Sequence, residues 1–410
     1  MSDSTITMSD LPKALWQSQL PVRGRILPAG DLMLVTLDAR THVGAEGQAE
    51  RLGVAALSLD LGDIVWTRWS LPPLAAVGAD SVYLYGRAGL VVTLALDGRE
   101  KWRTSLPDDR SPASVRSGDP LGPFYADVVV GDGTLYVPAG PEIVAIETST
   151  GALRVQRSVC AASRGVVVRL VRCGGDIELL ATCNARSDDD DSSVRRSHVL
   201  WEADPPPEAL RVTPGDLVAV GTTLDMIWRL SAPRTDQAYG DASPTVMEDG
   251  AIAVIASRVN GAGEERALSN LASWLLMVAK DGSLRWRREI PGGYRQPDPI
   301  AVLGGVVAGF DPTLYDVADG RVRWTVDSAS HQLNRTVPLC PYGENLIAVG
   351  AGELLAIACV DGSVRPVARF SAAPFHGCVT TPVRISGTHA YLGVEQPGEP
   401  PCLVAALLTG

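Results

Sequence analysis

The sequence predicts an all-β chain that closes into a ring of eight sheets, an eight-bladed β-propeller, with seven blades as the alternative. Three observations predict this fold. A glycine followed four residues later by a tryptophan recurs along the 410 residues. Short apolar segments precede each such glycine, and no segment keeps an apolar period of 3.6 residues. The first tryptophan has no strands before it, whereas the last strands have no tryptophan after them.

The glycine-to-tryptophan spacing is the repeating element. Four copies are complete, two keep the glycine and lose the aromatic residue, and aspartate precedes the glycine in four of the six. The complete copies are Gly62 with Trp66, Gly98 with Trp102, Gly282 with Trp286, and Gly320 with Trp324; the other two are Gly151 with Val155 and Gly362 with Pro366. Asp-Gly favours a type I′ turn, in which both central residues have positive φ. Each copy is therefore predicted to be a hairpin.

The strands around two of these hairpins illustrate the repeating unit. Residues 82–85, 90–96 and 100–104 are β-prone segments separated by turn residues, and they predict one set of three strands. The next set has the same layout and is predicted at residues 134–137, 143–146 and 153–157. A single sheet of this size cannot bury its apolar residues alone, so neighbouring sets are expected to stack.

Two weaker anchors, Trp16 and Trp228, complete the series of repeats. The eight anchor positions are 16, 66, 102, 155, 228, 286, 324 and 366. The final strands, within residues 379–408, have no closing anchor. We therefore expect the strand around Trp16 to complete the last sheet, because closing a ring removes exposed sheet edges. The chain then has a tail at residues 1–10 and a single propeller domain at residues 11–410.

Three polar segments interrupt the regular units, near residues 105–124, 184–214 and 258–270. None of them has the composition of a second domain, and such insertions are where specific function is expected. The second contains four consecutive aspartates, residues 188–191. These lack the alternating Asp-x-Asp-x-Asp-Gly spacing of a calcium loop, so we interpret them as a solvated acidic loop.

The sequence predicts no catalytic, cofactor-binding or metal-binding residues. The patterns G-x-S-x-G and G-x-x-x-x-G-K-[ST] do not occur. The five histidines show no spacing typical of zinc ligands; they are His42, His198, His331, His376 and His389. Trp69, Trp201 and Trp274 lie outside the anchor positions, and we interpret them as packing residues. Asn334-Arg335-Thr336 matches a glycosylation acceptor, which we interpret as incidental.

Charge and cysteine content limit the partners and the cellular compartment that we expect. The formal net charge of −11 disfavours nucleic acid and anionic membranes as partners. The seven cysteines contain no C-x-x-C pair, which favours a reducing compartment. Residues 1–15 lack the basic start and apolar run of a signal peptide, and no apolar run is long enough to cross a bilayer. We therefore expect a soluble, cytoplasmic protein.

One segment and the repeated pairs together resemble a known family. Residues 145–151, Ala-Ile-Glu-Thr-Ser-Thr-Gly, resemble the Ala-x-acid-x-x-Thr-Gly half of the tryptophan-docking motif of quinoprotein-like (PQQ-like) β-propellers. The Gly-x-x-x-Trp copies resemble the other half, and the resemblance covers about residues 11–410. It implies that the anchors pack between neighbouring blades. The implied blade-docking residues are Trp16, Trp66, Trp102, Trp228, Trp286, Trp324, Gly62, Gly98, Gly151, Gly282, Gly320 and Gly362.

The resemblance also bears on function. Quinone-dependent dehydrogenases of this fold hold their cofactor with a calcium ion, basic residues, a stacking tryptophan and commonly two adjacent cysteines. No two cysteines are adjacent in this chain, so we expect no cofactor.

We expect a non-catalytic protein-binding or scaffolding propeller, a subunit or accessory factor of a larger bacterial-type assembly. The alternative is a small-ligand sensor or an enzyme using the central channel, including a divergent quinone-dependent dehydrogenase. A third possibility resembles the outer-membrane assembly propellers. A cluster of inward-facing Arg, His and Asp would favour the channel, whereas aliphatic side chains filling it would favour the scaffold.

Overall fold

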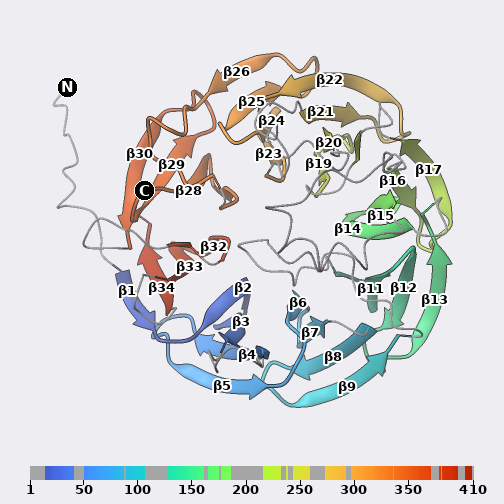
Figure 1. Cartoon of the computed structure of the whole chain (residues 1–410), viewed down its shortest axis with the longest axis vertical. Coiled ribbons are helices and arrows are strands. Elements are labelled where there is room, and N and C mark those ends of the chain that lie inside the picture. Colours follow the sequence, from blue (N-terminus) through green and yellow to red (C-terminus); the bar gives the residue numbers. More distant parts are fainter. Residues whose placement is uncertain are drawn as a thin grey trace, which may run out of the picture.

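Eight antiparallel sheets stand side by side around a central axis (Figure 1). This computed structural model describes residues 14–40, 50–86, 89–106, 128–160, 165–174, 177–185, 216–231, 237–238, 243–258, 273–291, 297–335, 337–370, 378–379, 381–395 and 402–408. The eight-bladed β-propeller is thereby confirmed. No helix in these ranges is long and apolar enough to cross a bilayer.

Each sheet is one blade, and its strands run in order from the axis to the rim. Blade 1 consists of β2 (Val22–Ala29), β3 (Leu32–Arg40), β4 (Glu50–Ser58) and β5 (Ile64–Trp69), and blade 2 of β6 (Leu74–Val77), β7 (Ser81–Tyr85), β8 (Leu90–Ala95) and β9 (Glu100–Ser105). Blade 3 consists of β10 (Val129–Gly131), β11 (Thr134–Ala139), β12 (Glu142–Glu147) and β13 (Leu153–Ser158), and blade 4 of β14 (Gly165–Gly174), β15 (Ile177–Ala185), β16 (Asp216–Val220) and β17 (Met226–Ser231).

The remaining four blades follow the same order, and in two of them the inner strand is split. Blade 5 consists of β18 (Gln237–Ala238) and β19 (Thr245–Val246) as its split inner strand, then β20 (Ile252–Arg258), β21 (Ser273–Val278) and β22 (Leu284–Ile290). Blade 6 consists of β23 (Ile300–Val302), β24 (Gly305–Ala308), β25 (Thr313–Asp316) and β26 (Val322–Thr325), and blade 7 of β27 (Cys340–Tyr342), β28 (Asn345–Val349), β29 (Glu353–Ala358) and β30 (Val364–Arg369). Blade 8 consists of β31 (Cys378–Val379) and β32 (Arg384–Ser386) as its split inner strand, then β33 (His389–Glu395), β34 (Cys402–Leu407) and β1 (Ala14–Ser18).

Blade 8 is built from both ends of the chain, as the sequence predicts. β1 pairs antiparallel with β34, with Trp16 opposite Ala405 and Ser18 opposite Leu403. In Figure 1 the first strand, blue, lies beside the last strand, red. The N-terminal strand therefore closes the ring by backbone hydrogen bonds, and it covers the edge that β34 would otherwise expose.

The apolar patterning of the strands reflects how the blades stack. The second and third strands are buried on both faces; all five residues of β7 are buried, for example. Each large apolar cluster extends over two neighbouring blades, as where Leu34 and Val54 of blade 1 pack with Leu84 and Val92 of blade 2. Outer strands alternate exposed and half-buried residues because their outer side meets water.

The Asp-Gly hairpins differ from the predicted type I′ turn. The glycines have positive φ, but among the described non-glycine residues positive φ occurs only at Ser70, Asp132, Leu224 and Gln332, so none of the repeat aspartates shares it. In the turn at Asp97 the N–H of Gly98 donates to Ala95 O at 2.9 Å, and the N–H of Ala95 donates to Arg99 O. This is a wider turn that ends in a left-handed glycine, a geometry compatible with the strand twist.

A bulge lies near the start of the outer strand in seven blades. The pairing slips by one residue so that the residue just before the anchor is extra. These seven bulge residues are Leu15, Val65, Lys101, Arg154, Ile227, Arg285 and Arg323. Blade 7 differs, because its slip lies one residue after Pro366.

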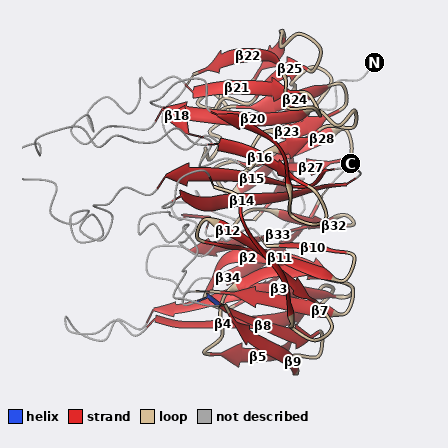
Figure 2. Ribbon diagram, turned by 90° about the vertical axis from the view of Figure 1, so that its right-hand side faces the viewer, coloured by secondary structure: helices blue, strands red, loops and turns tan. Residues whose placement is uncertain are grey.

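The antiparallel order gives the ring two different faces. The turns from first to second strand and from third to fourth strand lie on one face, which we call the short-turn face. Figure 2 shows short loops, drawn in tan, along this edge of the ring. The opposite face holds the ends of the second and fourth strands, and we call it the loop face.

All three predicted insertions follow strands that end on the loop face. β9 ends at Ser105, β15 at Ala185 and β20 at Arg258, at the beginning of the segments 105–124, 184–214 and 258–270. The inner parts of these segments, with the aspartates at 188–191, lie outside the described residues, as does the tail at 1–10.

Candidate functional site

Six tryptophans of the outer strands lie flat against a glycine in the next blade. The glycines have φ between +68° and +86°. A Cβ built on any of them would lie 2.4–2.9 Å from an indole carbon, closer than real Cβ contacts allow. The pairs are Trp16 with Gly62, Trp66 with Gly98, Trp102 with Gly151, Trp228 with Gly282, Trp286 with Gly320, and Trp324 with Gly362. Only glycine provides both the left-handed backbone and the missing side chain.

The same six indoles are also held at their polar end. Each indole N–H donates to a backbone carbonyl two or three residues before that glycine, at N···O distances of 2.7–3.2 Å. The acceptors are Leu59, Leu96, Thr148, Lys280, Val317 and Cys359, in ring order. Packing and hydrogen bond together define the orientation of each ring.

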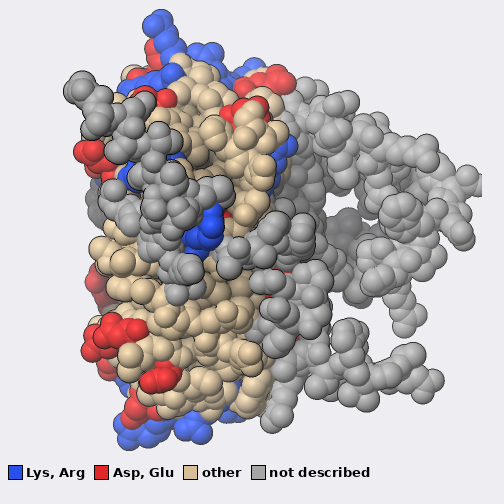
Figure 3. Space-filling view, turned by 90° about the vertical axis from the view of Figure 1, so that its left-hand side faces the viewer, with Lys and Arg blue, Asp and Glu red and all other residues tan. Residues whose placement is uncertain are grey.

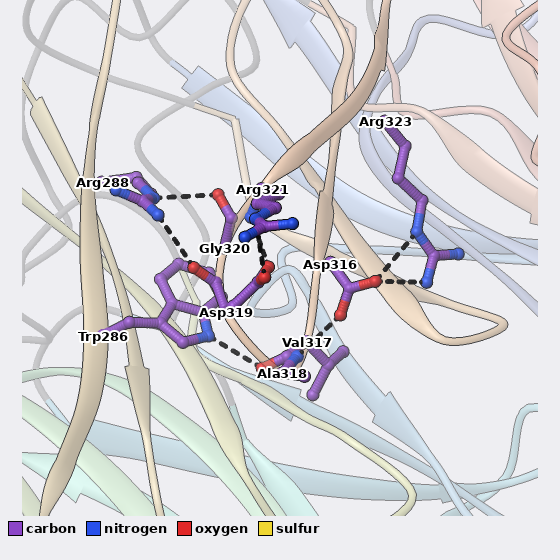
Figure 4. A network of polar contacts seen from close by, with 9 residues as sticks. All are labelled: Trp286, Arg288, Asp316, Val317, Ala318, Asp319, Gly320, Arg321 and Arg323. Carbon is purple, nitrogen blue, oxygen red and sulfur yellow. Dashed lines mark hydrogen bonds and ion pairs between the residues drawn. The ribbon is translucent and has the colours of Figure 1, made fainter.

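A second donor strengthens three of these contacts, two residues after the tryptophan. Arg288 of blade 5 donates from Nε to Gly320 O at 2.9 Å, and a second guanidinium nitrogen donates to Asp319 O at 2.9 Å (Figure 4). Arg68 and Thr104 donate likewise to Gly98 O and Gly151 O, at 3.1 and 2.7 Å. The outer strand therefore grips the next blade at two positions.

The aspartate before the glycine organises the turn that receives the indole. In each of the four Asp-Gly copies, an aspartate Oδ1 accepts the backbone N–H of the residue after the glycine at 2.9–3.0 Å. This local bond explains why aspartate precedes glycine there without needing positive φ. The Ser283 hydroxyl and N–H lower the pKa of Asp281 below its usual 3.8, and the Ser363 N–H and hydroxyl do the same for Asp361.

These turns predict a loss of stability in acid. A carboxylate whose pKa is lowered by folding stabilises the native state above the unfolded pKa, and that contribution disappears as the pH falls through the lower native value. We therefore expect the urea midpoint to decrease below about pH 4. Asp361→Asn keeps an acceptor oxygen but does not titrate, so its midpoint should fall less steeply. An identical acid profile for the variant would contradict this assignment.

The seam between blades 3 and 4 lacks both halves of the contact. Val155 occupies the tryptophan position of β13, and Leu224, four residues before Trp228, occupies the glycine position. Leu224 keeps the left-handed backbone, with φ of 61°, and is 2% exposed. Val155 packs against the same apolar cluster that contains Leu224. In blade 3 a valine is smaller than the usual tryptophan, and in blade 4 a leucine is larger than the usual glycine, so the two replacements compensate in volume.

The closing seam between blades 7 and 8 has a different exception. Pro366 occupies the tryptophan position of β30. Blade 8 has no turn between its third and fourth strands, because β34 and β1 are separate chain ends. The seam is held by an apolar cluster in which Val367 and Ala368 pack with Val404 and Ala406.

Exposed apolar side chains gather on one edge of the ring. All eleven large apolar residues that are exposed in the described ranges lie in turns of the short-turn face or at the start of an outer strand beside it. They are Leu15, Leu61, Ile64, Val65, Leu153, Met226, Ile227, Leu284, Leu303, Val322 and Val360.

Four of these residues flank the contact between Trp16 and Gly62, where β1 of blade 8 meets blade 1. Trp16 lies on Gly62, which brings Leu15 of β1 to the part of the rim that carries Leu61. Ile64 and Val65 begin the adjoining strand β5. We call Leu15, Leu61, Ile64 and Val65 the closure patch; their side chains are 49–69% exposed. Figure 3 views the ring from the side of β1 and β30, where uncharged atoms form a broad area and charges gather mainly along its edges.

The inner strands mix aliphatic residues with arginines that are already bound. β6 reads Leu-Ala-Ala-Val and β23 reads Ile-Ala-Val. Arg384 of blade 8 donates to Ile26 O of β2 at 3.1 Å, and Arg25 of β2 donates to Ala75 O of β6. These guanidiniums tie neighbouring inner strands together.

The other residues singled out from the sequence are not assembled into one site. His389 stacks on Tyr391 at 6.3 Å between ring centroids, while His331 is exposed in a loop. Trp69 packs against the apolar cluster that joins blades 8 and 1, and the Arg287 guanidinium lies 5.2 Å from the ring centroid of Trp274. His42, His198, His376 and Trp201 fall outside the described residues. No group of three or more His, Cys, Asp or Glu placed to hold a metal ion is found where the structure describes the chain.

Comparison with known proteins places this ring in a family. The family model described as outer membrane protein assembly factor BamB matches residues 12–169 and 199–387. The chain belongs to the BamB family. The resemblance to quinoprotein-like propellers is thereby confirmed. A search of curated proteins found no match.

Solved structures that are similar to this chain cover nearly all of it. BamB from Moraxella catarrhalis is 12% identical with a TM-score of 0.60, covering 96% of this chain and 99% of that one. The computationally designed protein Ika8 is 11% identical with a TM-score of 0.59, covering 97% and 99%. The Dos1 propeller is 10% identical with a TM-score of 0.60, covering 98% and 96%. At these identities the comparison shows the fold alone.

The closure patch of this BamB-family chain is not among the residues predicted from the sequence. The sequence does contain a signal for it, because the bulge residue before the anchor is basic in four blades and Leu, Val or Ile in three. The four basic residues pair with acidic groups beside the short-turn face, as where Lys101 reaches Asp80 at 2.7 Å and Arg285 reaches Asp249 at 2.6 Å. Leu15 and Val65 depart from that pattern in adjacent blades.

Proposed function

We propose that this chain is a non-catalytic, protein-binding propeller that serves as an accessory factor of a larger assembly. The observation that carries the proposal is the closure patch, Leu15, Leu61, Ile64 and Val65, on the rim of blades 8 and 1. Grouped apolar side chains on a water-exposed rim are typical of protein contacts, whereas scattered single ones are not.

The bulge positions support a specific role for this patch. In four blades the same position carries Lys or Arg, and those side chains form ion pairs with acidic groups of their own blade. The fold therefore accepts a charged residue at the bulge. Leu15 and Val65 do not serve blade stacking from this position, since they are 49% and 56% exposed. A partner that covers them would supply the burial that the chain itself does not.

Two further points favour binding over chemistry in the channel. The inner strands β6 and β23 are aliphatic, and Arg25 and Arg384 are engaged with carbonyls of the neighbouring blade. The name of the matched family, outer membrane protein assembly factor, also describes a component of an assembly.

The test changes the bulge residues to types that other blades carry. The purified chain and a Leu15→Arg, Val65→Lys double variant would be immobilised and exposed to an extract of the source cells. Captured proteins would be quantified by mass spectrometry. We expect a partner captured by the wild type to be reduced about tenfold or more by the double variant, the effect of removing a contact that contributes 1.4 kcal/mol.

A matched control makes the same change on the opposite side of the ring. Ile227 is the bulge residue of blade 4 and is 48% exposed. Ile227→Arg should leave capture unchanged. Equal capture by all three proteins would contradict the closure patch as the binding surface, and redox turnover with a bound quinone would contradict the non-catalytic assignment.

A further inference from the structure

Two buried thiols lie next to each other across the seam between blades 3 and 4. Cys160 follows the last strand of blade 3, and its N–H donates to Pro141 O at 3.2 Å. Cys183 lies on β15 of blade 4, opposite Asp216 of β16. Both belong to one apolar cluster, 8% and 3% exposed, and the Cys160 side chain is within hydrogen-bonding reach of Cys183. The pair therefore spans two blades.

A separate network holds the backbone of Cys160 against blade 4. Arg229 of β17 donates to Val159 O at 2.8 Å and lies 3.6 Å from the Asp216 carboxylate. Ser231 donates to the other Asp216 oxygen at 2.8 Å. Because Asp216 is the strand partner of Cys183, this network brings residues 159–160 to the level of Cys183. The approach of the two thiols thus follows from polar contacts as well as apolar packing.

We propose that Cys160 and Cys183 are a modification site at which a peroxide joins the two thiols in one disulfide. In the first step the Cys160 sulfur attacks one peroxide oxygen, giving a sulfenic acid and water. The Cys183 sulfur then attacks the Cys160 sulfur, the S–O bond breaks, the hydroxide leaves with the Cys183 proton as water, and the disulfide forms. Each molecule of hydrogen peroxide takes two electrons from the thiol pair and is reduced to two molecules of water.

The order of the two steps follows from the surroundings of the thiols. The Cys160 thiol and burial raise the pKa of Cys183 well above its usual value, so Cys183 holds its proton through the first step and gives it up only as water forms in the second. Cys160 is the more exposed of the two and meets the oxidant first. Cys183, already in contact, is placed to resolve the sulfenic acid before further oxidation.

The location gives this bond a mechanical consequence. The seam between blades 3 and 4 has Val155 and Leu224 where six other seams have an indole on a glycine. A disulfide from Cys160 to Cys183 would join the two blades covalently at the seam that lacks the indole-on-glycine contact. Oxidation is therefore expected to stabilise the ring at this seam. The proposal does not depend on the protein-binding function.

The test maps the bond in the intact, folded chain. Wild-type protein would be treated with a few equivalents of hydrogen peroxide, its remaining thiols alkylated, and the unreduced digest analysed by mass spectrometry. We expect a link between tryptic peptides 158–164 and 173–186, and two fewer reactive thiols out of seven. The oxidised protein should melt several degrees higher, and dithiothreitol should reverse both changes.

Two variants assign the bond and control for unfolding. Peptide 173–186 also contains Cys173, so Cys173→Ser serves as the matched control and should still form the link. Cys160→Ser should not. A link that forms only in urea, a different pairing, or sulfinic acid at Cys160 would overturn the modification site. A disulfide that forms without raising the melting temperature would contradict the expected stabilisation of the seam between blades 3 and 4.

Discussion

Gly62→Ala is expected to lower the free energy of unfolding by about 3 kcal/mol or more. Its Cβ would lie 2.4 Å from Cδ2 and Cε3 of Trp16, and the backbone there has φ of +72°. The indole must move away, so the variant loses packing at the contact that joins the N-terminal strand to blade 1. Urea unfolding followed by circular dichroism measures the loss.

Gly30→Ala distinguishes the cost of the steric clash with Trp16 from the cost of placing alanine in a left-handed backbone. Gly30 lies in the first turn of the same blade and has φ of +59°, but its Cβ would meet nothing within 4 Å. This variant should lose only about 1–2 kcal/mol, the cost of a left-handed alanine. Equal losses for the two variants would show that the indole contact contributes little at this position.

Val155 and Leu224 predict a strong coupling in a double-mutant cycle. Val155→Trp alone places an indole against Leu224 and should cost about 2–3 kcal/mol by overpacking. Leu224→Gly alone removes a buried side chain and should cost about 2–3 kcal/mol, after relief of the left-handed strain at φ of 61°. Together they recreate the indole-on-glycine contact of six other seams, so the double variant should return to within about 1 kcal/mol of the wild type.

The cycle has a spectroscopic readout as well as an energetic one. In the double variant the new indole should be buried, with a blue-shifted fluorescence emission, and its N–H should find a carbonyl in the turn before residue 224, as the other six do. Additive losses, or an exposed new indole, would contradict the idea that Val155 and Leu224 compensate each other.

The ring was predictable because its main signals are local and repeated. The Gly-x-x-x-Trp spacing identifies the outer hairpin of four blades, and the anchor at Trp16, which has no strands before it, identifies the closing strand. The turn type was not predicted correctly, since Asp97 and its equivalents have ordinary negative φ and act through their carboxylates. A two-residue pattern does not distinguish these turns; the hydrogen bonds around the glycine do.

The candidate binding surface was less predictable. Leu15 and Val65 are ordinary apolar residues in the sequence, and an apolar residue in a strand is most often core. Their meaning depends on the bulge that points them outward and on the contact of Trp16 with Gly62 that brings two blades together. The Cys160 and Cys183 thiols are likewise 23 residues apart in the numbering of the chain and meet only across a seam.

Local chemistry in this chain was enough to predict a ring of eight blades, with seven as the alternative, together with the hairpin that ends most blades and the strand that closes the ring. Each of these depends on residues only four positions apart or on an anchor that has no strands before it. The pairing of each indole with the glycine of the following blade, the substitution of Val155 and Leu224 for that pair, and the gathering of exposed apolar residues at the closure depend on how whole sheets stack. Stacking brings together residues some 30 to 70 positions apart, and no spacing along the chain records which of them will touch.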